Sequence, residues 1–251
     1  MDPTEQIVRL EVDDGVATIT LDSQHNRNAL SRQLVGELGE RLDEVAATDG
    51  VRVIVLTNAG PSFCAGADLK ERSTGTPDST PIVRIFEHLM DAAQPTVASV
   101  KGAVRAGGIG LMASCDLVVV HESVTFALTE VRIGVAPAII SVPILRRVPP
   151  SRIAAAMLTG EPFGADEARA IGLITHVSDD VEAATAALCA GIIAGAPRAV
   201  AETKRMLNHV PGLDRATAFV EMRALSDELF SGPDAAEGMA AFREKRPPRW
   251  S

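Results

Sequence analysis

The stretch PTVASVKGAVRAGGIGLMASCDLVVVH, residues 95–121, decides the fold class. Its two ends, Pro95–Val100 and Asp116–His121, are almost continuously apolar. Such runs are typical of parallel strands that are buried on both faces of a sheet. Between them we expect a loop over 101–106 and then a short helix, because Gly107–Cys115 consists mainly of small and apolar residues. A strand, a helix and a second strand in this order indicate an α/β protein.

The residues before this stretch extend the pattern toward the N-terminus. Two β-type runs, Ile7–Val12 and Val16–Leu21, flank Asp13-Asp14-Gly15, and this arrangement predicts a hairpin. Ser31 then begins a helix whose apolar residues recur at helical spacing. Val51–Thr57 is a further run with the composition of a buried parallel strand.

The residues after the stretch are mostly helical. Beyond Ile139 the expected helices are interrupted by Leu173–Ser178, and the last fifty residues or so predict three helices. We therefore expect an α/β core over residues 1–195 and a helical region over 196–251. On the residues alone, this second region is either a small subdomain or an oligomerisation module.

Composition excludes several classes of protein. Apolar residues make up 46% of the 251 residues and charged residues 23%, which is the composition of a globular chain. The formal net charge of −9 argues against non-specific binding to nucleic acid or to an anionic membrane. The three cysteines, Cys64, Cys115 and Cys189, are far apart, and no apolar run approaches 18 residues. We expect reduced thiols and a cytoplasmic protein.

Two glycine-bearing loops are the first candidates for a functional site. They contain FCAGADL (63–69), in a loop expected over 58–68, and VRAGGIGL (104–111), and each comes after a buried strand and before a predicted helix. Free backbone N–H groups at such positions favour negative charge, and two converging loops would offer two donors to one oxygen atom. The alternative is that the turns simply require small residues.

The second loop also matches a dinucleotide-binding pattern. Gly108–Ala113 reads GIGLMA, which is G-x-G-x-x-A, and Glu130 lies twenty residues after Gly110, where a ribose-binding acid belongs. However, seven residues separate Val100 from Gly108, whereas the first glycine of that motif directly follows its strand. An NAD-dependent oxidoreductase is therefore only a distant alternative.

Glu130 is the leading candidate for an acid–base group. It lies in the apolar segment FALTEV (126–131), where partial burial would raise the pKa of its carboxyl group. A carboxylate with a raised pKa suits general acid–base catalysis. The alternative is a helix-start carboxylate or an ion pair with Arg132.

Several segments in a fixed order resemble the crotonase superfamily, which contains the enoyl-CoA hydratases and isomerases. The segments cover nearly the whole chain and are RNALS (27–31), FCAGADL (63–69), residues 95–120, FALTEVRIGVAP (126–137), LTGEPFGADEARAIGLITHV (158–177) and EGMAAFREKRPP (237–248). The resemblance implies the crotonase (ClpP-like) α/β fold, a spiral of β-β-α units with a helical C-terminal trimerisation region. It also implies a homotrimer or a dimer of trimers.

The resemblance further implies that the substrate is an acyl-CoA thioester whose enolate is held by two backbone N–H groups. By motif position these belong to Ala67 and Gly107. No metal and no separate cofactor is expected, since coenzyme A arrives as part of the substrate. The residues expected to bind CoA are Arg27, Ala65, Asp68 and Leu69 in the same subunit, with Phe242 and Lys245 reaching the CoA of a neighbouring subunit.

One position departs from the family pattern. Hydratases of the family use two glutamates, and the resemblance places the second at Glu130 and the first at the position of Gly110. Hydration of a 2-enoyl-CoA stays the leading expectation by family frequency, whereas a single glutamate fits Δ3,Δ2-enoyl-CoA isomerisation better. A CoA-ester-binding protein without turnover also fits the loss of one glutamate. A glutaconyl-type hydratase, in which Arg105 or Arg132 pairs with an acyl carboxylate, fits it as well.

Overall fold

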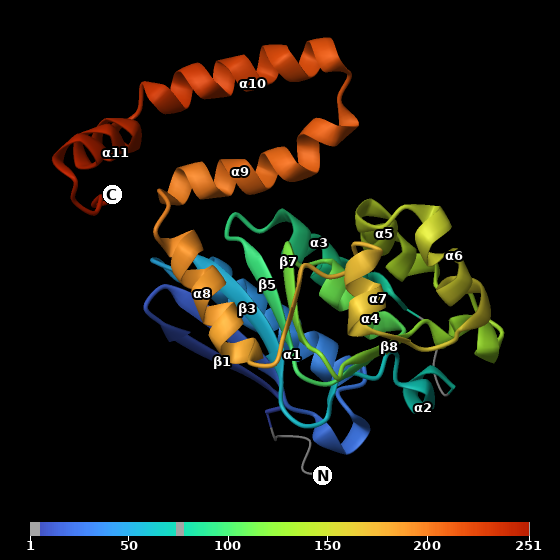
Figure 1. Ribbon diagram of the computed structural model, residues 1–251. Helices are drawn as coiled ribbons and strands as arrows, with labels where there is room; N and C mark the ends of the chain where they lie inside the picture. Colours follow the sequence, from blue (N-terminus) through green and yellow to red (C-terminus); the bar gives the residue numbers. More distant parts are fainter. Residues whose placement is uncertain (1–5, 74–77, 251) are drawn as a thin grey trace.

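Two mixed β-sheets form the centre of the molecule. A computed structural model describes residues 6–73 and 78–250. The first sheet has six strands in the order β1-β2-β3-β5-β7-β10, and the second has four in the order β4-β6-β8-β9. Helices surround both sheets, and the last helices extend away from them (Figure 1).

The N-terminal hairpin is confirmed. Strands β1 (Val8–Asp13) and β2 (Val16–Leu21) pair antiparallel, with Asp13 opposite Val16. The turn residues Asp14 and Gly15 have φ values of 44° and 78°. Positive φ at both central residues is the backbone requirement of the two-residue turn that Asp-Gly favours.

The buried parallel strands are also confirmed. They are β3 (Val53–Asn58), β5 (Thr96–Val100), β7 (Leu117–His121) and β10 (His176–Ser178), and each pairs parallel with its neighbour in the first sheet. All five residues of β5 are buried. Their apolar composition therefore reflects burial on both faces of the sheet.

The second sheet corrects the two loops expected over 58–68 and 101–106. The first contains β4 (Ser62–Cys64) and the second contains β6 (Ala103–Arg105), and these pair parallel. β8 (Thr125–Ala127) and β9 (Phe163–Gly164) complete the sheet. Strands of two or three residues are too short to show the alternation of side chains that identifies a strand.

From β3 to β8, successive strands alternate between the two sheets, which is the predicted spiral of β-β-α units. Each pair of strands contributes its first strand to the first sheet and its second strand to the second sheet, in the pairs β3–β4, β5–β6 and β7–β8. One or more helices follow each pair. The helices of this part are α1 (Arg32–Ala46), α2 (Leu69–Arg72), α3 (Thr80–Asp91), α4 (Gly107–Ala113), α5 (Ala138–Arg147), α6 (Pro150–Thr159) and α7 (Ala165–Ala170).

The C-terminal part is helical as predicted. Helix α8 (Val181–Ile193) covers the first sheet, and α9 (Pro197–His209), α10 (Arg215–Phe230) and α11 (Pro233–Glu244) follow it. Helices α10 and α11 stand away from the sheets (Figure 1). Among the described residues no single helix meets the length and apolarity of a membrane span, and the pair that passes jointly, Val181–Ile193 with Pro197–Gly212, is bent by 110°.

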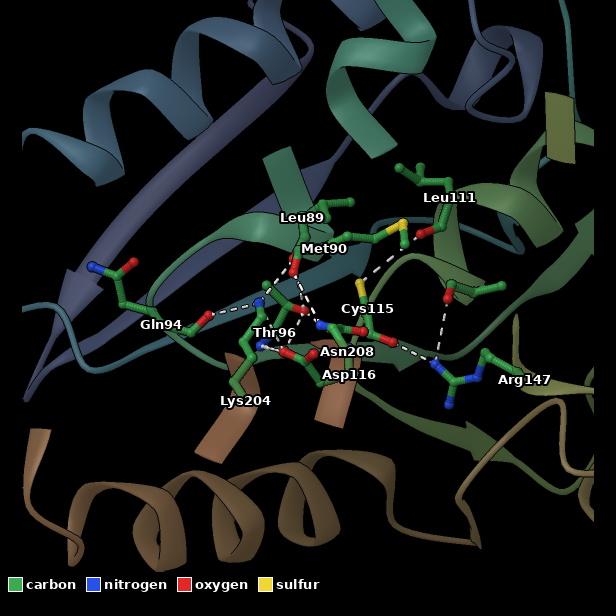
Figure 2. A network of polar contacts seen from close by, with 11 residues as sticks. Leu89, Met90, Gln94, Thr96, Leu111, Cys115, Asp116, Arg147, Lys204 and Asn208 are labelled. Carbon is green, nitrogen blue, oxygen red and sulfur yellow. Dashed lines mark hydrogen bonds and ion pairs between the residues drawn. The ribbon is translucent and has the colours of Figure 1, made fainter. Parts of the chain in front are cut away.

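An ion pair between the buried Lys204 and the partly buried Asp116 attaches helix α9 to the first sheet (Figure 2). Lys204 Nζ lies 3.0 Å from Asp116 Oδ2 and donates hydrogen bonds to the carbonyl oxygens of Leu89 and Gln94. Asp116 Oδ2 also accepts from the backbone N–H of Thr96 at 2.7 Å. Asp116, just before β7, therefore has a structural hydrogen-bonding role.

Candidate active site

The first glycine-bearing loop leads from β4 into α2. The Asp68 carboxylate caps α2 by accepting from the backbone N–H groups of Lys70 and Glu71. Gly66 has φ of +89°, and a Cβ at this position would lie 2.8 Å from the Cβ of Ala106. Glycine is therefore required here both by the backbone conformation and by the close approach of the second loop.

The second loop leads from β6 into α4 and meets the first. Ala106 precedes α4 with φ of 47° and ψ of −119°, and the helix begins at Gly107. A Cβ built on Gly107 would lie 3.8 Å from the backbone nitrogen of Ala67. The two residues expected to donate to one oxygen atom are thus neighbours, although 40 positions separate them in the sequence.

The second sheet brings the segment that precedes Glu130 next to the second loop. Strand β8 pairs with β6, and the N–H of Ala106 donates to the carbonyl oxygen of Ala127 at 2.9 Å. Glu130 follows three residues later, in the 3-10 helix Thr129–Ile133. Its Oε2 is buried and has no hydrogen-bond partner among the described residues. Burial raises the pKa of the Glu130 carboxyl group above its ordinary value.

Gly110 lies inside α4, where the space for a side chain is already filled. A Cβ at this position would come within 2.5 Å of Ile140 Cγ2 and 3.0 Å of Phe86 Cζ. Ile140 belongs to α5 and Phe86 to α3, and both are buried. The position at which the family resemblance places a first glutamate is therefore enclosed by two apolar side chains.

The dinucleotide-binding interpretation of GIGLMA is wrong. These residues form the buried helix α4 rather than a turn between a strand and a helix. A Cβ on Gly108 would lie 2.7 Å from the Cβ of Cys64, so the backbone here packs against protein. The glycines thus permit close packing between α4 and its neighbours and leave no room for a pyrophosphate.

The two candidate arginines differ in their partners. Arg132 forms an ion pair with Glu161, and its Nε donates to the carbonyl oxygen of Thr159 at 2.9 Å. The expected alternative of an ion pair between Glu130 and Arg132 is therefore not what the structure shows. Arg105 donates to the carbonyl oxygen and the hydroxyl group of Thr125, and no carboxylate in the described chain forms an ion pair with it.

The residues expected to bind CoA fall into two groups. Arg27 is exposed, and its carbonyl oxygen accepts from the N–H of Ala65 in the first loop at 3.1 Å. Leu69, at the start of α2, is also exposed. Phe242 and Lys245 lie on α11 and just after it, and α11 is remote from α4 in the same chain (Figure 1). Phe242 is 86% exposed. The structure therefore brings the first group to the two loops and does not bring the second.

Two residues that the sequence analysis did not single out also shape the site. Ile140 fills the space beside Gly110, and Leu30 packs against Gly107, where a Cβ would lie 2.8 Å from Leu30 Cδ1. Both are ordinary aliphatic residues in helical or loop segments. Their contacts reach positions 30 or more residues away, so no local signal could have identified them.

Comparison with known proteins places this arrangement in a family. The family model "Enoyl-CoA hydratase/isomerase" matches residues 11–251. The chain therefore belongs to the enoyl-CoA hydratase/isomerase family, whose fold is the crotonase fold. An enoyl-CoA hydratase from Mycobacterium smegmatis has a similar structure, with a TM-score of 0.92 and 30% identity, covering 98% of this chain and 99% of that one.

The relatives in sequence carry hydratase names. A Thermus thermophilus protein named "Putative enoyl-CoA hydratase" is 37% identical over 96% of this chain and 100% of its own length. The enoyl-CoA hydratase EchA19 of Mycobacterium tuberculosis is 32% identical over 92% of this chain and 91% of its own length. A mitochondrial methylglutaconyl-CoA hydratase of Mus musculus is 29% identical over 96% and 81%. Acyl-CoA substrates are what this family implies for the chain.

Proposed function

We propose that the protein moves a proton at the carbon next to the carbonyl of an enoyl-CoA thioester, with Glu130 as its single acid–base group. The observation that carries this proposal is the unpartnered buried Oε2 of Glu130, three residues beyond a strand that pairs with the Gly107 loop. The backbone N–H groups of Ala67 and Gly107 would hold the thioester oxygen. The reaction that fits one carboxylate best is isomerisation of a 3-enoyl-CoA to a 2-enoyl-CoA.

The steps of this reaction balance with the groups present. The Glu130 carboxylate removes a proton from C2 of the 3-enoyl thioester, and the electron pair moves onto the thioester oxygen. Two N–H donors stabilise the resulting dienolate because they are aimed at the position where negative charge develops. Glu130, now protonated, delivers a proton to C4 while the electrons return, which leaves the double bond between C2 and C3.

Hydration is the second candidate, and the names of the relatives favour it. Hydration of a 2-enoyl thioester requires a positioned water molecule as well as a proton for carbon. The enclosure of Gly110 by Ile140 and Phe86 weighs against a second carboxylate at that point. If the substrate is a glutaconyl-type thioester, Arg105 is the arginine that would pair with its acyl carboxylate, because Arg132 already forms an ion pair with Glu161.

The experiment is an assay of 2-enoyl, 3-enoyl and 3-methylglutaconyl thioesters in D₂O, with products followed by mass. Conversion of the 3-enoyl substrate at unchanged formula, apart from exchanged deuterium, is the expected result. Gain of one water would establish hydration instead.

Glu130→Gln should lower kcat by about 10²–10⁴-fold. Glu122→Gln, at an exposed glutamate nearby, is the matched control. Binding of acyl-CoA without any turnover would indicate a CoA-ester-binding protein.

We also propose the organisation that this function requires. Residues 1–195 form the core that binds the thioester, and residues 196–251 form the oligomerisation region of a homotrimer or a dimer of trimers. Arg27, Ala65, Asp68 and Leu69 would border the CoA of the same subunit, with the Asp68 carboxylate serving as the cap of α2. Phe242 and Lys245 are exposed in one chain, which suits contact with a neighbouring subunit.

A further inference from the structure

The segment that joins β2 to α1 runs beside the first glycine-bearing loop. The N–H of Leu30 donates to the carbonyl oxygen of Gly66 at 2.7 Å, and Leu30 forms an isolated parallel bridge with Ala67. Earlier in the segment, the carbonyl oxygen of Arg27 accepts from the N–H of Ala65. The backbone around Leu30 therefore fixes the position of the loop that carries the Ala67 N–H group.

The side chain of Leu30 reaches the second loop. A Cβ built on Gly107 would lie 2.8 Å from Leu30 Cδ1, so this methyl group already packs against the α-carbon of Gly107. Leu30 is partly buried and packs against the main hydrophobic core. One residue thus contacts both loops, the first through its backbone and the second through its side chain.

Hydrogen bonds fix the chain on both sides of Leu30. Asn28 is only 1% exposed, its Oδ1 accepts from the N–H of Ser23 at 2.6 Å, and its Nδ2 donates to the carbonyl oxygens of Ala59 and Ser62. On the other side, Ser31 caps α1 by accepting from the N–H of Leu34 at 3.2 Å. Because Asn28 and Ser31, on either side of Leu30 in the chain, are fixed by these hydrogen bonds, Leu30 cannot easily move away from Gly107.

We propose that Leu30 is a positioning residue that sets the separation between the N–H groups of Ala67 and Gly107. This inference rests on the proposed function, in which these two groups hold the thioester oxygen. Donors stabilise a developing oxyanion only when they are held in place before the reaction, and a displacement of about 1 Å reduces rates strongly. Leu30 touches neither the substrate nor the reacting atoms in this proposal, so its effect is on kcat.

The test compares Leu30→Ala with Leu10→Ala, because both leucines are partly buried and pack against the same core. Leu30→Ala should lower kcat by about 10–100-fold with little change in KM or in the Kd for a saturated acyl-CoA. Leu10→Ala should leave kcat within about twofold. Leu30→Met should restore most of the rate because it refills the contact with Gly107. Leu30→Val should lower kcat by a smaller factor, and it replaces Leu30→Ala in the test if that variant does not fold.

Hydrogen exchange gives a readout that does not depend on turnover. Leu30→Ala or Leu30→Val should accelerate exchange in peptides covering 63–69 and 104–111, and Leu10→Ala should not. Unchanged exchange in both loops, a loss of kcat equal to that of Leu10→Ala, or a rise in KM at constant kcat would each overturn the proposal. If the wild-type protein turns over no acyl-CoA, the proposed function fails, whereas the exchange data still decide whether Leu30 fixes the two loops.

Discussion

Ile140 fills the space beside Gly110, and a Cβ at position 110 would lie only 2.5 Å from its Cγ2. The contact joins helices α4 and α5, which pack against each other. Introducing an acid at position 110 therefore requires two changes, one for the carboxylate and one for the room it needs.

Gly110→Glu alone should destabilise the protein and should not increase hydration, because overpacking a buried site costs about 1–3 kcal/mol or more. Gly110→Glu with Ile140→Gly should recover part of the stability, because it removes both the Cγ2 at 2.5 Å and the Cβ at 2.8 Å from a Cβ at position 110. The same double variant should raise the hydration of a 2-enoyl-CoA at least about tenfold over Gly110→Glu. Product mass and thermal unfolding measure the two effects. Gly110→Glu with Ile144→Gly is the control, since Ile144 is a buried isoleucine of the same helix as Ile140. Equal hydration in the two double variants would contradict the prediction.

The pH dependence of isomerisation should report Glu130. Burial raises the pKa of its carboxyl group, and the reaction begins from the carboxylate form. The rate kcat/KM should therefore fall as the pH is lowered through this raised pKa, at a higher pH than for an ordinary glutamate. A pH–rate profile of the wild-type protein between pH 4 and pH 8, roughly the range over which such groups titrate, measures this. A profile that stays flat down to the ordinary pKa of glutamate would remove Glu130 from the role of base.

Lys204→Met should strongly destabilise the protein. It removes the cation that faces the partly buried Asp116 carboxylate, and the loss should reach at most about 3–5 kcal/mol, the cost of breaking a fully buried pair. Adding Asp116→Asn should recover part of that loss, because the second substitution removes the uncompensated charge. Urea unfolding of the two variants and the wild type measures the difference. If the double variant is less stable than Lys204→Met, the pair is not what stabilises this contact.

Ala106→Gly should stabilise the protein by about 1 kcal/mol. Ala106 has φ of 47° and ψ of −119°, which a residue with a Cβ rarely adopts. Such a conformation costs about 1–3 kcal/mol, and the greater freedom of glycine in the unfolded chain offsets part of the gain. Ala103→Gly, in the adjacent strand β6 and without positive φ, should destabilise instead. Thermal unfolding compares the two, and a loss of stability in Ala106→Gly would contradict the argument.

Phe219→Glu should shift the protein toward monomers. Phe219 and Phe230 on α10 are 72% and 71% exposed in one chain, which is unusual for large apolar side chains. If α10 is the trimer contact, a charge on its apolar surface opposes association. Analytical ultracentrifugation measures the change in mass. The control is Arg215→Glu at the start of the same helix, which adds a negative charge without removing an aromatic side chain.

Much of the fold follows from local sequence, and the packing of the site does not. The predicted run Val51–Thr57 covers all of the buried strand β3 except its last residue, Asn58, and Pro95–Val100 contains β5. Asp14-Gly15 forms the predicted hairpin turn. Each of these patterns depends on neighbouring residues. The convergence of the two glycine-bearing loops follows from the order of the strands, since they come after neighbouring strands of one sheet.

The contacts of Leu30 and Ile140 could not be predicted in the same way. They join positions far apart in the chain, and an aliphatic side chain gives no sign of which glycine it will cover. Strands β4 and β6 could not be predicted, because three residues are too few to show the alternation of side chains that identifies a strand. The partner of Arg132 was also missed, because Glu161 lies 29 residues away and nearer acids were equally plausible.

Association through the exposed phenylalanines of α10 and α11 would make the stability of the fold depend on protein concentration. Phe219, Phe230 and Phe242 face solvent in a single copy. When association covers such side chains, the law of mass action links stability to the amount of protein present. A homotrimer of this chain should therefore melt at a lower temperature when it is diluted.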